Sequence, residues 1–115
     1  MNKKMISVRA LVAVGMTVTV AFAMEQSLED RGKALFNDPA FAGGQRACND
    51  CHPNGRNLQK VGTKTKFTTM GKEQSSLEET INMCITQAIK GKAIPEDSKE
   101  MKAMVSYIRS LGANP

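Results

Sequence analysis

The sequence predicts a small all-α domain built from three main helices, and three observations support this prediction. Apolar residues recur at helical spacing in three segments, each of which follows a serine that can cap a helix. No segment shows strand-like alternation of useful length. The 115 residues include four Phe, one Tyr and no Trp, so the domain needs additional buried bulk, such as a disulfide, a metal or a large cofactor.

The first predicted helix begins after Ser27 and ends at Asn37-Asp38-Pro39. Ser27 can cap the helix, and Asp30 three residues later can form the second half of a capping box. The residue before a proline disfavours helical backbone, so Pro39 marks the end of this segment. The apolar positions expected on the buried stripe are Leu28, Ala34, Leu35 and Phe36.

Two further helices are predicted in the C-terminal half. One runs from Ser76 to Gly91, and the other begins near Asp97 or Ser98 and is closed by Gly112 and Pro115. The apolar face of the first contains Leu77, Ile81, Cys84, Ile85, Ala88 and Ile89, and that of the second contains Met101, Met104, Val105, Ile108 and Leu111. A polar stretch, residues 53–74, precedes both helices, and a loop of this length is uncommon in a compact domain unless it wraps something.

Residues 1–23 have the pattern of a secretory signal peptide. Basic residues come first, residues 10–23 are almost entirely uncharged and apolar, and the run ends in the cleavage pattern Ala21-Phe22-Ala23. Crossing a bilayer takes about 20 apolar residues, so this pattern favours cleavage over an uncleaved anchor. We therefore expect a mature chain of residues 24–115 in the periplasm or an equivalent exported compartment, without membrane association.

The predicted cleavage changes the charge of the protein. The full chain has 16 basic and 11 acidic residues, for a net charge of +5. The signal peptide contains three of the basic residues and none of the acidic ones, so the mature charge is +2. Because the basic excess lies largely in the removed segment, nucleic-acid binding is not expected. Export also implies an oxidising compartment, in which three cysteines would suggest a disulfide.

Two of the three cysteines belong to a more specific pattern. The sequence Cys48-Asn49-Asp50-Cys51-His52 is a C-x-x-C-H motif, the attachment signature of c-type haem. Two thiols at this spacing can add to the two vinyl groups on one edge of a porphyrin. The adjacent His52 is then held beside the iron as an axial ligand. The motif therefore predicts one covalently bound haem c.

Two alternatives to haem were considered for this motif. A thioredoxin-like redox pair would be accompanied by a βαβ pattern, and no β-rich segment precedes Cys48. A zinc site needs four ligands, and only Cys84 would be left to complete Cys48, Cys51 and His52. Haem c fits an exported chain better than either alternative.

The chain resembles the class I cytochromes c over nearly all of its predicted mature part. The matching features are Gly32 and Phe36 in the first helix, the C-x-x-C-H motif, and Tyr107 and Leu111 in the last helix. The resemblance implies a small class I cytochrome c fold, in which three main helices surround the haem. In that family the first and last helices cross at right angles, with a glycine allowing their close contact.

A second resemblance is to the haem domains of sulfur-oxidising cytochromes, namely thiosulfate dehydrogenases and the dihaem subunit of the Sox complex. The matching residues are Ile81-Asn82-Met83-Cys84, Gly91-Lys92-Ala93-Ile94-Pro95, Ser98, Glu100-Met101, Met104 and Tyr107-Ile108. The chain is also similar to small monohaem cytochromes of anaerobic ammonium-oxidising bacteria, which pair as heterodimers. These resemblances imply that Cys84 is the distal haem ligand. The chain differs from the sulfur enzymes in having one haem motif and no second domain.

The residues themselves leave the distal ligand open. A second histidine is excluded because His52 is the only one. Among the methionines, Met70 is the main alternative to Cys84, which is the one thiol outside the motif. The other groups considered are Met83, Met101 and Met104, and Lys60, Lys64, Lys66 and Lys72. The lysines are expected instead to form a solvated rim that can dock an acidic partner.

We expect an electron carrier or a redox- and gas-responsive protein rather than an enzyme. A Cys84 thiolate would stabilise ferric over ferrous iron, giving a low potential, and its loss on reduction would admit NO or CO. A redox partner protein is implied by such a role. The second resemblance adds a heterodimer with a related small cytochrome c. The alternatives are a haem subunit of a thiosulfate-oxidising enzyme and an ordinary carrier with histidine and methionine ligands.

Overall fold

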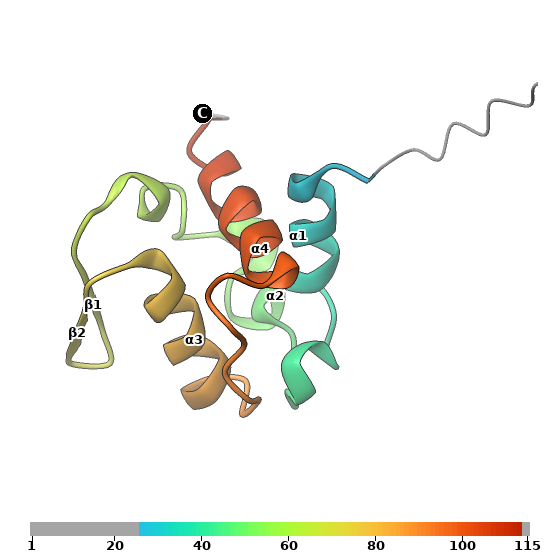
Figure 1. The fold of residues 1–115 in the computed structure, drawn as a ribbon, viewed down its shortest axis with the longest axis horizontal. Coiled ribbons are helices and arrows are strands. Elements are labelled where there is room, and N and C mark those ends of the chain that lie inside the picture. The colour runs from blue at the N-terminus through green and yellow to red at the C-terminus, as the bar shows by residue number, and fades with distance from the viewer. Residues whose placement is uncertain (1–25, 114–115) are drawn as a thin grey trace, which may run out of the picture.

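The computed structural model describes residues 26–113, so the predicted signal peptide, residues 1–23, lies outside the described part. The helices are α1 (Leu28–Phe36), α2 (Cys48–Cys51), α3 (Leu77–Gln87) and α4 (Lys99–Ser110), and strands β1 (Phe67–Thr69) and β2 (Lys72–Gln74) form an antiparallel hairpin (Figure 1). Three single-turn 3-10 segments lie at Phe41–Gly43, Pro53–Gly55 and Val61–Thr63. None of the helices in this part of the chain is long and apolar enough to cross a membrane.

The three long predicted helices are present, but the number of helices and the absence of strands were predicted wrongly. The described residues form four α-helices, because the haem motif itself makes a single helical turn, α2. The hairpin escaped prediction because each strand has only three residues, too few to show alternation. Its turn is Met70-Gly71, with φ of 53° and 74°, rather than the Asn-Gly pair that usually signals such a hairpin.

The predicted helix starts are confirmed by their caps. The hydroxyl oxygens of Ser27, Ser76 and Ser98 each accept a hydrogen bond of 3.1 Å from the N–H three residues later. The predicted end of α3 at Gly91 is wrong: the helix ends at Gln87, and Lys90 takes the left-handed conformation with a φ of 59°.

The predicted apolar stripe of α1 needs a correction. Leu28 and Ala34 are exposed, whereas Phe36 is buried as predicted and Leu35 is partly buried; Gly32, which was not placed on the stripe, is also buried. The reason is that α1 contacts the rest of the molecule through one close crossing with α4, and only this narrow side of α1 is covered.

The contact between α1 and α4 depends on Gly32. A Cβ atom at this position would overlap the Ala103 carbonyl oxygen and lie 2.7 Å from the Tyr107 Cβ. One turn away, the Phe36 and Tyr107 rings pack with centroids 5.2 Å apart and planes tilted by 59°. The class I resemblance predicted this glycine and this aromatic pair, and both are found in the contact.

The core joins this helix pair to α3 and the hairpin. It contains Phe36, Phe41, Phe67, Leu77, Ile81, Ile85, Ile89, Met101, Met104, Val105, Tyr107 and Ile108. Helix α3 lies between α4 and the hairpin and contacts both strands, as Figure 1 shows. One face of α3 is thus directed toward the middle of the molecule, where α2 also lies.

We predict that Gly32→Ala lowers the free energy of unfolding by about 3 kcal/mol, because the added methyl group meets backbone that cannot move aside cheaply. Gly43→Ala is the matched control, since a Cβ there meets nothing within 4 Å and only the φ of 71° is unfavourable. The control is expected to cost about 1 kcal/mol. Chemical denaturation of the two holoproteins measures both values, and equal losses would contradict the steric explanation.

Candidate functional site

The C-x-x-C-H motif is folded into a fixed turn by its own polar residues. The Asp50 carboxylate accepts a hydrogen bond of 3.1 Å from the Ala47 N–H, and the His52 N–H donates to the Cys48 carbonyl at 3.0 Å. The Asn49 side-chain oxygen accepts from the Asn54 N–H at 2.8 Å, which ties the turn to the next segment. The two intervening residues of the motif therefore hold Cys48, Cys51 and His52 in place.

The imidazole of His52 is oriented by the backbone that follows it. Its Nδ1 lies 2.9 Å from the carbonyl oxygen of Arg56. A carbonyl can only accept, so Nδ1 carries the hydrogen and Nε2 is left with a lone pair. This is the arrangement that orients a metal-binding histidine and increases its basicity as a ligand. His52 is therefore set to bind iron through Nε2.

Helix α3 brings Cys84 to the same apolar cavity as Cys48 and His52. The cavity holds about 450 Å³ of empty space, part of which is open to solvent. Its walls are formed by Phe36, Cys48, His52, Leu58, Val61, Leu77, Thr80, Ile81, Cys84, Ile85, Met104 and Ile108. The Thr80 hydroxyl donates to the Ser76 carbonyl at 2.9 Å, so it is satisfied within its own helix. Apart from Thr80, the polar groups at the cavity are thus two thiols and one imidazole.

The electrostatics of the cavity keep its thiols protonated. Burial, with a smaller contribution from the nearby Cys84, raises the pKa of Cys48 to about 11. Burial also raises the pKa of Cys84, with a smaller contribution from Cys51. All three cysteines are free thiols. An uncharged, apolar site suits a large hydrophobic ring better than a hydrated ion.

The residues present fit haem c. Cys48 and Cys51 would form the thioethers, and His52 would bind one face of the iron. The sulfur of Cys84 or that of Met104, both at the cavity, could bind the other face. When bound, the haem supplies one-electron redox chemistry at its iron. The zinc alternative is not supported, because no group of three or more His, Cys, Asp or Glu side chains within residues 26–113 is arranged to hold a metal ion.

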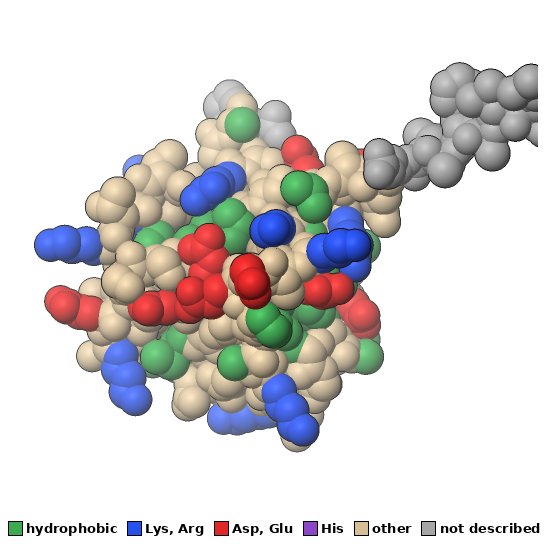
Figure 2. Space-filling model, in the orientation of Figure 1, with side chains coloured by type: hydrophobic (Ala, Val, Ile, Leu, Met, Phe, Trp, Pro, Cys, Tyr) green, Lys and Arg blue, Asp and Glu red, His purple; other side chains and the backbone are tan. Residues whose placement is uncertain are grey.

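Of the other candidate ligands, Met104 alone reaches the cavity. Met70 is 56% exposed at the tip of the hairpin, and Met101 is buried in the core away from the cavity wall. Met83 lines a shallow outer pocket beside the hairpin, whereas Met104 reaches the cavity from α4. The four lysines considered as ligands, Lys60, Lys64, Lys66 and Lys72, are all exposed. On the face shown in Figure 2, basic side chains project at the edges and acidic ones form a band across the middle.

Several residues at or near the site were not identified from the sequence. Leu58 and Val61 lie in the polar stretch and line the cavity, so part of this stretch lies against the site. Gln74, at the end of β2, is one of two buried polar residues in the described part of the chain. The sequence signal for Leu58 and Val61 was their spacing of three residues in an otherwise polar segment. Nothing in the sequence distinguished Gln74 from its polar neighbours.

Comparison with known proteins identifies the family of this chain. A family model described as "SoxA/TsdA, cytochrome c domain" matches residues 31–114, which is most of the chain. The match confirms the predicted resemblance and the covalently bound haem c that such a domain implies. No curated protein and no solved structure matches the chain.

We predict that covalent haem is lost when both Cys48 and Cys51 are changed to alanine and is retained in Cys84→Ala. The reason is that only the motif thiols are adjacent to His52 on the α2 turn. Haem staining of the denatured proteins after electrophoresis, with peptide mass spectrometry, distinguishes the variants. Haem that remains attached in the double variant, or is lost in Cys84→Ala, would contradict the assignment of the three thiols.

Proposed function

Since the chain belongs to the SoxA/TsdA cytochrome c domain family and so binds haem c, we propose that it is an exported monohaem electron-transfer protein with His52 and Cys84 as axial ligands. The observation that carries this proposal is the shared cavity. Cys84 on α3 and His52 after α2 are walls of one apolar space, and His52 already has its Nδ1 satisfied. The signal-peptide pattern of residues 1–23 supports a periplasmic or equivalent location.

Cysteine ligation would set the redox properties of this protein. A thiolate donates strongly to ferric iron and favours it over ferrous iron, so the reduction potential is low. The aliphatic side chains of α3 and α4 exclude water from the site, which also tunes the potential. Such a protein carries electrons at low potential and needs no further catalytic group.

Reduction of the iron would also open a binding site for small diatomic ligands on the face of the haem next to Cys84. Burial raises the pKa of the Cys84 thiol, so its sulfur holds a proton once ferric iron no longer competes for the lone pair. A neutral thiol is a weak ligand, and its departure opens one face of the iron. NO and CO are the ligands that we propose for the reduced protein.

The proposed partners follow from the exposed parts of the site. Cys51 is exposed, so the attachment edge of the haem lies at the surface, where electrons can pass to a redox partner. The exposed lysines Lys60, Lys64, Lys66 and Lys72 favour an acidic partner surface. A related small cytochrome c is the partner that the resemblance to heterodimeric cytochromes implies.

A second candidate function is a haem subunit of a thiosulfate-oxidising enzyme. The family match favours this function, because the matched domain is that of SoxA and TsdA, the sulfur-oxidising cytochromes that the sequence resembles. The described chain shows one haem motif, so a second chain would have to supply the rest of a substrate site. Turnover of thiosulfate with an artificial electron acceptor by the purified protein would move this function ahead of simple electron transfer.

We predict that the ferric protein gives a low-spin electron paramagnetic resonance spectrum with a compressed g-spread and no near-infrared methionine-to-iron band. Cys84→Met should introduce that band and raise the midpoint potential by on the order of 100 mV, since axial ligands set haem potentials over about 0.8 V. Met70→Leu is the matched control and should change neither spectrum nor potential. A methionine band in the wild type that disappears in Met70→Leu would overturn Cys84 ligation.

We also predict that the ferrous protein binds CO at neutral pH and that its CO affinity falls only when the pH rises beyond the range in which an ordinary thiol ionises. The sign follows from the raised pKa of Cys84: below it the sulfur is protonated and leaves the iron, and above it the thiolate competes with CO. Optical titration at several pH values measures the effect. Failure to bind CO at any pH would remove the gas-binding part of the proposal and leave electron transfer intact.

A further inference from the structure

The side chain of Gln74 is buried without a hydrogen-bond partner. The residue is 6% exposed, and neither its Nε2 nor its Oε1 has a partner among residues 26–113. An amide buried in this way costs about 1–3 kcal/mol for each unsatisfied group. Native proteins satisfy nearly all such groups, so an amide with two of them indicates a polar partner from outside the polypeptide.

The hairpin turns this amide toward the interior. Gln74 on β2 pairs directly with Phe67 on β1, and directly paired residues lie on the same face of a hairpin. Phe67 belongs to the same buried core as Leu77 and Ile81 of α3. These two α3 residues line the haem cavity, whereas Gln74 itself lines the two pockets beside the hairpin. The next pair, Thr68 and Glu73, lies on the opposite face and is exposed. Gln74 is therefore on the inner face of the hairpin, beside the α3 wall of the cavity.

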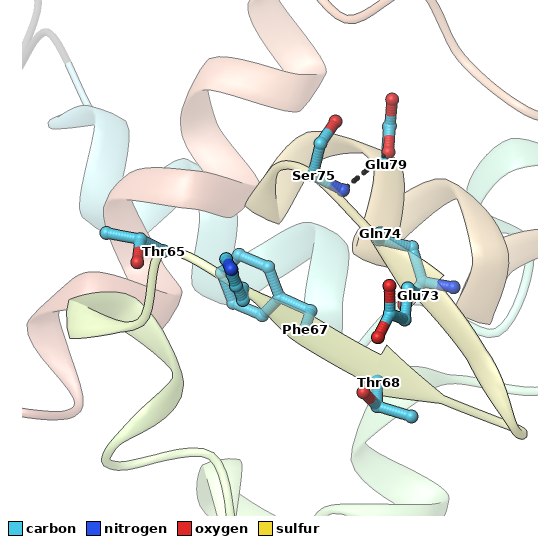
Figure 3. A pocket seen from close by; sticks show the side chains of 8 residues that line it. Thr65, Phe67, Thr68, Glu73, Gln74, Ser75 and Glu79 are labelled. Carbon is cyan, nitrogen blue, oxygen red and sulfur yellow. Dashed lines mark hydrogen bonds between the residues drawn. The ribbon is translucent and has the colours of Figure 1, made fainter.

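The polar groups around Gln74 are engaged elsewhere or directed to solvent. Figure 3 shows Gln74 on β2 next to the start of α3, where the Ser75 N–H donates to the Glu79 carboxylate at 2.9 Å. The charged residues that line the two pockets beside Gln74 are Lys66, Lys72, Glu73, Glu79 and Glu96, and all five are exposed. None of them forms a hydrogen bond with the buried amide. The missing partner is thus expected on the inner side of the hairpin.

The chemistry of haem c supplies one kind of group that fits this position. The ring is joined to the protein at its vinyl edge, through Cys48 and Cys51 in α2. Its two propionate carboxylates lie on the opposite edge and are the only polar groups on its periphery. The hairpin packs against α3 rather than forming part of the α2 turn, as Figure 1 shows. A ring anchored at α2 and lying along α3 extends its free edge toward the hairpin.

We propose that the Gln74 side chain binds a propionate of the haem, with Nε2 donating a hydrogen bond to a carboxylate oxygen. An amide offers a donor and an acceptor, so it can hold an ionised carboxylate through Nε2 and a protonated carboxyl group through both atoms. The inference depends on haem c, which the family establishes, and not on the identity of the distal ligand. The test of this inference is therefore independent of whether Cys84 is the distal ligand.

The test compares the ferric holoproteins of the wild type and Gln74→Leu. The direct readout is the propionate bending band in the resonance Raman spectrum, whose frequency rises with hydrogen bonding to the carboxylate. The band should move to lower frequency in Gln74→Leu, and the melting temperature should fall by about 5 °C or more, because a charge-assisted hydrogen bond is lost. Thr68→Val is the matched control, since it removes a polar group from the exposed face of the same hairpin.

The Raman band decides the outcome. An unmoved band in Gln74→Leu overturns the proposal, whatever the melting temperature does. An unmoved band together with a higher melting temperature would show that the amide is unsatisfied even in the holoprotein, because leucine removes its desolvation cost. Should Gln74→Leu fail to mature, Gln74→Asn replaces it: the amide is kept but withdrawn by one methylene, and the band should again shift downward. The Cys84→Met substitution is expected to leave this propionate band unchanged, because it alters only the proposed distal ligand.

Discussion

The fold depends on filling the apolar cavity between the segment after α2 and the inner face of α3. Its aliphatic walls come from nearly every part of the described chain, and without a group between them these side chains would lose their packing contacts. A chain with four Phe, one Tyr and no Trp has little bulk of its own to offer. Haem c supplies the missing apolar bulk. Covalent attachment at Cys48 and Cys51 would make it a permanent part of the core.

The close crossing of α1 and α4 places side chains in the wall of the same cavity. Because Gly32 lets the two backbones meet, Phe36 can be buried between Tyr107 and the interior. Phe36 then lines the cavity together with Met104 and Ile108 from α4. The ion pair between Arg31 and Glu100, 3.0 Å apart, is half exposed and adds little to this contact. The close fit at Gly32 thus helps to position three apolar side chains of the cavity wall.

The parts of this molecule that follow local rules could be predicted from the sequence, and those set by the haem could not. Serine caps and helical periodicity predicted the starts of α1, α3 and α4, and the C-x-x-C-H motif predicted haem c, which the family match confirms. The hairpin strands have only three residues each, and the burial of Gln74 depends on packing against distant parts of the chain, so neither has a local sequence pattern. The exposure of Leu28 likewise reflects how narrow the crossing of α1 with α4 is, which periodicity alone cannot reveal.

Cys84 and Gln74 are proposed to interact with different charged groups of one cofactor, the iron and a propionate. With the proposed ligation, Cys84 would face the iron, whose charge changes with redox state, and burial opposes the ionised thiol unless ferric iron stabilises it. This makes the sulfur a ligand whose attachment depends on the electron count. Gln74 lies beside the α3 wall, where an uncharged amide can hold a carboxylate without changing its own charge. Together the two proposals describe a protein that would release one face of the iron on reduction while the propionate edge of the ring stayed fixed.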